Sequence, residues 1–63
     1  MTPEKIKKHD RYTNVIRLLK KLKEYLDLEL ADGDMEADEH NTLSGFNQMG
    51  VDKAQEKLKK LHD

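Results

Sequence analysis

The spacing of apolar residues between positions 12 and 30 constrains the fold more than any other feature of this sequence. Apolar side chains recur there at steps of three and four residues, which gathers them on one side of an α-helix. Arg17, Lys20, Lys21 and Glu24 fall mostly on the opposite side. The segment therefore predicts a long amphipathic helix. Its apolar side consists of Tyr12, Val15, Ile16, Leu18, Leu19, Leu22, Tyr25, Leu26 and Leu30.

The apolar side of this helix is broad and spans nearly half of the circumference. A single neighbouring helix in a hairpin covers less than that, so the helix is expected to pack against two neighbours, within a small bundle or across a dimer. A chain of 63 residues buries only roughly 60 % of its unfolded surface. Small domains compensate with disulfides, metals or self-association, and this chain has no cysteine. We therefore expect a homodimer.

Local signals mark both ends of the first helix. Thr2 can accept a hydrogen bond from a free backbone N–H, and Pro3 suits the first helical position, where its missing N–H costs nothing. Asp10 offers a second cap, in which case the first turns form a separate short helix or a frayed end. Gly33, directly after Asp32, supplies the positive φ that ends many helices. The sequence predicts a tight turn there, with Asp34 capping the next helix.

The returning segment has a weaker pattern. Met35, Leu43, Phe46 and Met49 share a helical face, but several poor helix formers separate them. The stretch around Gly50 favours a helix end, with Gly50 left-handed, Val51 folded back onto Phe46, and Asp52 and Gln55 forming the capping box of a third helix. The alternative is one helix that runs straight through Gly50. Ala54, Leu58 and Leu61 give the last segment one apolar face.

These patterns predict an all-α fold in a single small domain, residues 1–63. A long N-terminal helix is followed by one or two shorter returning helices, as a helical hairpin or a small three-helix bundle that dimerises into a larger bundle. Phe46, Met49, Leu58 and Leu61 are expected to form the wall opposite the interface. The predicted dimer or partner interface comprises Val15, Ile16, Leu19, Leu22, Leu26 and Leu30.

The charge is strongly segregated although the formal net charge is only −1. Residues 1–25 carry eight Lys or Arg against three acids, residues 26–49 carry seven acids and no Lys or Arg, and residues 50–63 carry four Lys against three acids. Such a dipolar chain can pair with itself head to tail or within one hairpin. The small net charge gives no overall attraction to nucleic acid or membrane.

The acidic segment invites a metal-binding interpretation, which its spacing does not support. A calcium loop starting at Asp32 needs glycine and glutamate where this chain has Ala37 and Leu43. His9, His40 and His62 have no ligand spacing, so we expect no metal and no other cofactor. Acids near the start of a helix are stabilised by its dipole. The predicted acidic surface comprises Asp27, Glu29, Asp32, Asp34, Glu36, Asp38 and Glu39.

The basic segments suggest nucleic-acid binding as the alternative function, through residues 5–23 or the final helix. The stretch "LSGFNQMGVDKAQEKLKKL", residues 43–61, resembles a helix-turn-helix DNA-binding motif, with a Gly-Val turn and a basic second helix. It departs from that motif at Phe46, Glu56 and Lys59, so the motif is degenerate. The predicted nucleic-acid contacts are Lys20, Lys21, Lys23, Lys53, Lys57 and Lys60.

Catalysis and membrane insertion have little support in the sequence. There is no Ser/His/Asp set at motif spacing and no phosphate-binding glycine loop, and the chain is too short to enclose a small-molecule substrate. No apolar run approaches the length of a membrane span. We therefore expect a cytoplasmic protein that is not an enzyme and has no membrane partner.

The favoured hypothesis is a small regulatory or inhibitory module that binds itself and a larger protein. Small dimeric helical proteins of this kind are common among phage and plasmid accessory proteins. In length and expected hairpin the chain also resembles Rop, a small plasmid-encoded dimer that forms a four-helix bundle and binds RNA. That resemblance concerns architecture alone and carries over no site.

Overall fold

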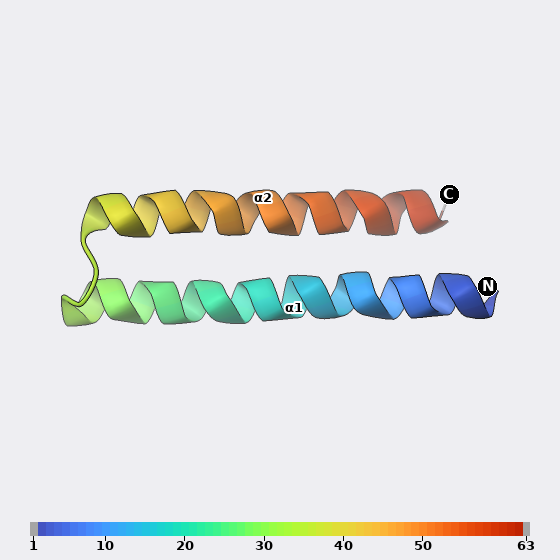
Figure 1. The fold of residues 1–63 in the computed structure, drawn as a ribbon, viewed down its shortest axis with the longest axis horizontal. Helices are drawn as coiled ribbons and strands as arrows, with labels where there is room; N and C mark the ends of the chain where they lie inside the picture. Colours follow the sequence, from blue (N-terminus) through green and yellow to red (C-terminus); the bar gives the residue numbers. More distant parts are fainter. Residues whose placement is uncertain (1, 63) are drawn as a thin grey trace.

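The chain is a hairpin of two long α-helices joined by a short turn (Figure 1). The computed structural model describes residues 2–62 and places α1 at Pro3–Asp32 and α2 at Ala37–His62. The helices run antiparallel along an elongated molecule whose Cα extents are 47 × 14 × 10 Å. The all-α class, the long first helix and the hairpin alternative are thereby confirmed, and the three-helix alternative is wrong.

Both ends of α1 follow the predicted chemistry. The Thr2 hydroxyl accepts a hydrogen bond from the Lys5 backbone N–H at 3.2 Å, and the helix begins at Pro3. At the other end Gly33 has φ 82°, and its N–H donates to the Leu30 carbonyl. The Asp34 N–H donates to the Glu29 carbonyl at 3.0 Å, which completes a Schellman motif. Because α1 is continuous, the expected alternative of a separate first helix capped by Asp10 is wrong.

The predicted break at Gly50 is wrong, because α2 runs without interruption from Ala37 to His62. Asp52 does not cap a third helix; its carboxylate accepts a hydrogen bond from the Gln48 side chain one turn earlier, at 2.8 Å. Asp34 also does not cap α2, because the helix starts at Ala37, two positions later than a cap at Asp34 predicts. The sequence around Gly50 contains all the residues that a helix end and a new cap require. Packing against α1 nevertheless continues on both sides of Gly50, and this keeps α2 a single helix.

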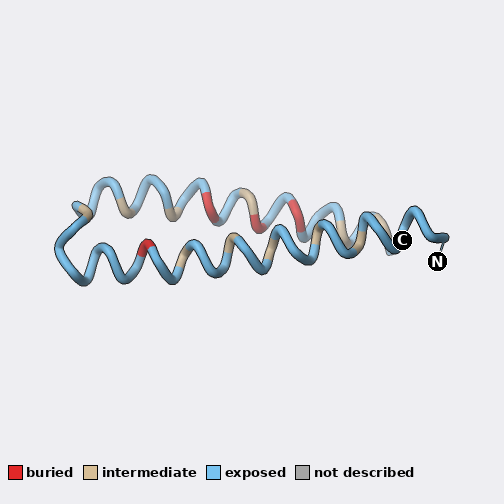
Figure 2. Tube along the Cα trace, turned by 60° about the horizontal axis from the view of Figure 1, so that its bottom comes forward, coloured by how far each residue is buried: buried red, intermediate tan, exposed pale blue. Residues whose placement is uncertain are grey.

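The two helices meet along a narrow seam, and Figure 2 shows its buried positions facing the other helix. Among residues 2–62 only three apolar residues are buried: Leu26 is 7 % exposed, and Val51 and Ala54 are each 5 % exposed. The seam follows alternating steps of three and four residues, as in antiparallel helix pairs. Its buried and half-buried positions are His9, Tyr12, Ile16, Leu19, Lys23 and Leu26 of α1 and His40, Ser44, Asn47, Gly50, Val51, Ala54, Leu58 and Leu61 of α2.

Gly50 lies on the seam, inside the continuous α2, at a point where Leu19 of α1 comes close. A Cβ atom built on Gly50 would lie 2.9 Å from Cδ1 of Leu19, whereas one on Gly45 would meet nothing within 4 Å. The missing side chain at position 50 therefore makes room for Leu19.

This contrast between the two helical glycines gives a prediction. Gly45→Ala should raise the free energy of unfolding by about 0.5–1 kcal/mol, because alanine is the better helix former and the site is open. Gly50→Ala should stabilise the protein less than Gly45→Ala does, because the Leu19 side chain must shift to admit the new methyl group. Chemical denaturation followed by circular dichroism compares the two variants. Equal stabilisation by both would contradict the close approach at Leu19.

Candidate protein-interaction surface

One side of the hairpin exposes large apolar side chains from both helices. We call this surface the apolar flank and define it as Val15 and Leu22 of α1 with Leu43 and Phe46 of α2. Their exposed fractions run from 39 % for Leu43 to 65 % for Phe46. Leu22, Leu43 and Phe46 border a groove of about 310 Å³ whose floor includes Leu26. On a small soluble domain, neighbouring exposed apolar side chains of this kind usually mark an interaction site.

The flank becomes basic toward the chain ends. Next to Val15, a depression is bordered by Arg11, Lys53 and Lys57, with Gly50 at its inner edge. Further out, Lys57 Nζ lies 5.7 Å from the centre of the Tyr12 ring, in the range of a cation–π contact. Lys8 and Lys60 line a neighbouring depression beside Tyr12. The structure thus brings basic residues from the two ends of the chain together. This end also contains an acidic residue, Glu4, which lies one helical turn before Lys8 in the sequence.

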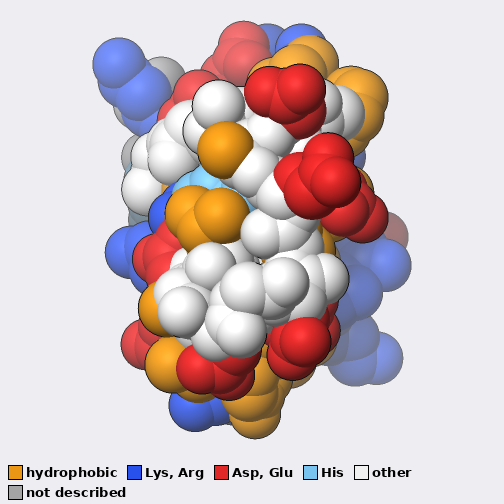
Figure 3. Space-filling model, turned by 90° about the vertical axis from the view of Figure 1, so that its left-hand side faces the viewer, with side chains coloured by type: hydrophobic (Ala, Val, Ile, Leu, Met, Phe, Trp, Pro, Cys, Tyr) orange, Lys and Arg blue, Asp and Glu red, His pale blue; other side chains and the backbone are white. Residues whose placement is uncertain are grey.

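The other end of the molecule, around the turn, is acidic. Figure 3 looks onto this end and shows Asp and Glu side chains gathered around it. Glu29 lies two helical turns beyond Leu22, and Glu39 lies one turn before Leu43, so both continue the rows of the apolar flank. Asp38 and Glu39 occupy the first turn of α2, where the helix dipole favours negative charge. Asp32, Asp34 and Glu36, also predicted as acidic surface, are exposed at or near the turn.

Asp27 links the two helices near this acidic end. Its carboxylate accepts a hydrogen bond from Lys23 one turn earlier and lies 2.7 Å from His40 Nε2 of α2. Both contacts favour the ionised carboxylate and hold the pKa of Asp27 below its ordinary value of 3.8. The hydrogen bond from Lys23 has the larger effect, and the one with His40 has the next largest. Asp27 therefore pairs both within α1 and, through His40, with α2.

The lowered pKa of Asp27 predicts a pH dependence of stability. A carboxyl group whose folded pKa lies below its unfolded pKa stabilises the fold above pH 3.8, and this contribution is lost as the pH falls through the folded pKa. Asp27→Asn should therefore be less stable than wild type near neutral pH, and the difference should shrink below pH 3.8. Denaturation over a pH series measures it, with Asp34→Asn as a control for the lost charge. A difference independent of pH would contradict the assignment.

A buried polar contact fixes the register of the two helices. Asn47 is 7 % exposed, and its side-chain N–H donates to the backbone carbonyl of Leu19 at 2.7 Å. A buried amide needs such a partner, because an unpaired one costs about 1–3 kcal/mol. Sequence reasoning missed Asn47; the available signal was its place on the 3–4 spacing of Val51, Ala54 and Leu58.

The structure separates the predicted interface residues into two groups. Ile16, Leu19 and Leu26 lie in the seam of the hairpin, whereas Val15 and Leu22 lie on the apolar flank. Leu30 is exposed near the turn. Of the four residues expected on the opposite wall, Leu58 and Leu61 are half-buried in the seam, Met49 is exposed, and Phe46 lies on the apolar flank beside Leu22.

The six lysines predicted as nucleic-acid contacts do not form one surface. Lys53, Lys57 and Lys60 border the depressions at the basic end, although Lys60 also lies 3.6 Å from Glu56. Lys23 binds Asp27. The remaining two, Lys20 and Lys21, lie on the other side of α1. The helix-turn-helix interpretation of residues 43–61 is wrong, because α2 is continuous where the motif needs a turn.

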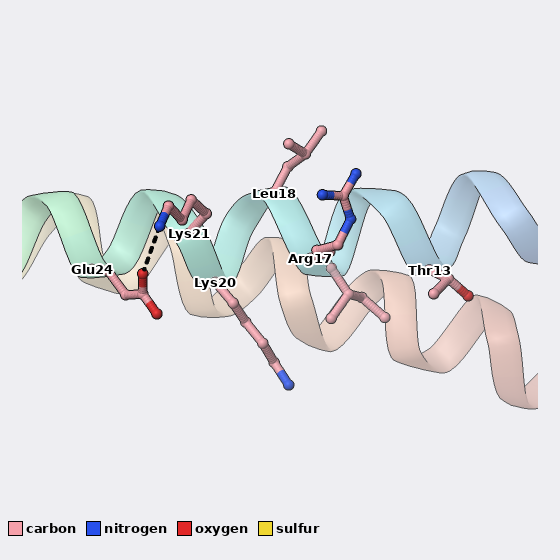
Figure 4. Close-up of a pocket in the computed structure, with 7 residues that line it drawn as sticks. Thr13, Arg17, Leu18, Lys20, Lys21 and Glu24 are labelled. Atoms are coloured by element: carbon pink, nitrogen blue, oxygen red, sulfur yellow. Dashed lines mark ion pairs between the residues drawn. The ribbon is translucent and has the colours of Figure 1, made fainter.

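The polar side of α1 carries an open depression, shown in Figure 4, that does not have the geometry of a reaction site. Lys21 forms an ion pair with Glu24 at 3.3 Å, and its neighbours Arg17, Leu18 and Lys20 point in different directions (Figure 4). Side chains that catalyse a reaction must converge on one point. This side of the helix therefore resembles a solvated surface.

Comparisons with protein-family models, with curated proteins and with solved structures find no match for this chain. Within residues 2–62, neither helix combines the length and the apolar character that crossing a membrane requires. Over the same residues, His, Asp and Glu side chains nowhere gather in threes as metal ligands would.

Proposed function

We propose that this chain is a small, non-enzymatic cytoplasmic protein that forms a homodimer and, in that form, regulates or inhibits a larger protein. The observation that carries the proposal is the apolar flank. Three large apolar side chains from two helices, Leu22, Leu43 and Phe46, border a groove there, and Val15 is exposed beside the next depression. Among residues 2–62, the seam buries only three apolar residues. Interaction modules expose apolar surface in this manner because a partner completes their core.

The size of the exposed surface supports a second copy. A compact monomer of 7.4 kDa exposes about 4,200 Å², whereas this chain exposes 5030 Å². The excess of roughly 800 Å² matches what each partner contributes to a standard protein interface. Closing two hairpins flank to flank gives a four-helix bundle, the usual solution for paired amphipathic helices.

The acidic turn end supports the further, larger partner. Asp34, Asp38 and their neighbours project from the end of the hairpin, beyond the apolar flank, and stay available in a flank-to-flank dimer. A concentrated patch of one sign attracts a protein surface of the opposite sign and orients it during encounter. The expected partner therefore presents a basic surface to the turn.

Two measurements test this function. Light scattering over a concentration series should give the mass of a dimer; a strict monomer with unchanged helicity would overturn the dimer. A photo-crosslinking amino acid at Asp38, introduced in the native host cell, should capture one discrete larger protein. The same group at Gln55, an exposed position of α2 far from the turn, should not capture it. If cross-links form only between copies of this chain, the proposal of a larger partner is overturned.

The basic end favours one alternative function, a nucleic-acid-binding regulator. Lys8, Arg11, Lys57 and Lys60 come from distant parts of the sequence yet surround Tyr12. Such a cluster can neutralise successive phosphates, and binding of that kind weakens steeply with salt. Anisotropy with mixed-sequence DNA and RNA tests it. Affinity lost in Lys57→Ala/Lys60→Ala, but kept in Lys20→Ala/Lys21→Ala, would support this alternative.

A further inference from the structure

We propose that the second copy packs antiparallel on the apolar flank, so that the basic end of each hairpin faces the acidic end of the other. This inference rests on the proposed self-association and specifies its geometry. In this arrangement α1 lies against α1 of the partner and α2 against α2 of the partner. A two-fold axis in the plane of the interface, perpendicular to the helices, relates the two copies.

The placement of opposite charges along each helix carries the inference. On α1, Arg11 and Glu29 are eighteen residues apart, and on α2, Glu39 and Lys57 are also eighteen residues apart. Eighteen residues are five helical turns, or about 27 Å, so the two members of each pair lie on the same face. One two-fold axis can bring Arg11 opposite Glu29 of the partner subunit and also Lys57 opposite Glu39 of the partner subunit. For this the pairs must be level, which means that their midpoints lie at the same height along the hairpin.

The contacts between the helices show that these pairs are level. Lys57 lies over Tyr12, next to Arg11, and His40 contacts Asp27, so that Glu39 lies at the height of Glu29. The midpoint is residue 20 on α1 and residue 48 on α2. These two positions also face each other, because Leu19 contacts both Asn47 and Gly50. The same axis thus serves both helices.

The apolar surface between the charged ends is also self-complementary about this axis. Leu22 lies two residues from the axis in each copy, and Phe46 of one copy comes opposite Gly50 of the other. Phe46 is the most exposed large apolar residue of the flank, and Gly50 borders the depression beside Val15. Leu19 fills the space at Gly50 on the seam side, so the depression is what receives the Phe46 ring. A projecting ring opposite a small residue is the arrangement by which helices interdigitate. The two-fold axis repeats this contact on both sides.

The opposite orientation is electrostatically unfavourable. If the copies met with like ends together, Arg11 would face Lys57 of the partner subunit, and Glu29 would face Glu39 of the partner subunit. Like charges set directly opposite destabilise an interface, whereas the antiparallel arrangement forms four attractive pairs. Both orientations close the same apolar flank, and only the charges at its ends differ in their pairing.

Reversal of the charges tests the orientation. One variant carries Arg11→Glu and Lys57→Glu, and a second carries Glu29→Lys and Glu39→Lys. Each alone should form dimers about tenfold more weakly or worse at low ionic strength, because every pair becomes repulsive. An equimolar mixture should recover a heterodimer of wild-type affinity. All four residues are exposed, so circular dichroism should show helical chains in both variants. The mixture shows that the variants can still pair, and the weakening of each separate variant tests the orientation. Unchanged dimerisation of the separate variants would overturn it.

Cross-linking separates this inference from the proposed dimer itself. The chain has no cysteine, so Arg11→Cys, Glu29→Cys and Lys57→Cys each introduce a single thiol. With a short bismaleimide, Arg11→Cys mixed with Glu29→Cys should give linked dimers, and each alone should not. Links between Arg11→Cys and Lys57→Cys would overturn the antiparallel pairing but not the dimer. A dimeric mass without links in either mixture would have the same meaning. A monomeric mass would overturn the dimer as well.

Discussion

Replacing Leu26 by alanine is expected to lower the free energy of unfolding by about 2–4 kcal/mol. Leu26 is 7 % exposed and is the only leucine among the buried residues of the hairpin. It forms the floor of the groove beside Asn47, so its removal creates a cavity in the seam. Because a domain of this size has little stability to lose, the variant should be largely unfolded at physiological temperature.

Thermal and chemical denaturation measure this loss, and the chain contains a matched control. Leu28 has the same chemistry, lies two residues away and is 57 % exposed. Leu28→Ala should change the free energy of unfolding by no more than about 0.5 kcal/mol, as exposed substitutions usually do. If Leu28→Ala cost as much as Leu26→Ala, the seam would not be the core of this fold.

The first helix could be predicted from the sequence because its signals are local. The Thr2 cap, Pro3 and the Gly33 turn each depend on residues within one helical turn, and all three have the expected role. The apolar periodicity from Tyr12 onward was strong enough to fix the helix between these ends. Local chemistry and packing agree along α1.

The second helix could not be predicted to the same extent, because its inward face is made of small and polar residues. Asn47, Gly50 and Ala54 occupy seam positions, while Phe46 and Met49, which dominate the apolar pattern, are exposed. The apolar letters therefore mark a face of α2, but not the face that meets α1. Gly50 appeared to end the helix, yet it accommodates Leu19 across the seam.

The candidate interface was accessible to sequence reasoning only in outline. The segregation of basic and acidic residues is visible in the sequence, and so is the excess width of the apolar side of α1. Their common geometry is not, because it depends on the register of the hairpin. That register is set by contacts between distant residues, namely Asn47 with Leu19 and His40 with Asp27. Once these are known, the charged pairs of the two helices fall at equal heights.

Leu22→Asp is expected to have the largest effect on self-association, weakening it about a hundredfold or more. Leu22 lies at the centre of the apolar flank and is 47 % exposed in the single hairpin. A carboxylate at this position would be buried without a partner once two flanks close. The two-fold symmetry places the substitution in the interface twice, so its cost is incurred twice. Light scattering and sedimentation should then report a monomer at concentrations where the wild type is a dimer.

Leu28→Asp introduces the same charge on an exposed part of the same helix and should leave the dimer mass unchanged. The helical content separates two roles for the second copy. If Leu22→Asp is monomeric and largely unfolded, the hairpin depends on its partner for stability, as the thin seam leads us to expect. If it is monomeric and fully helical, the hairpin folds alone and the partner only covers the flank. A Leu22→Asp protein that keeps both its helicity and the wild-type mass would show that the apolar flank is not where two copies meet.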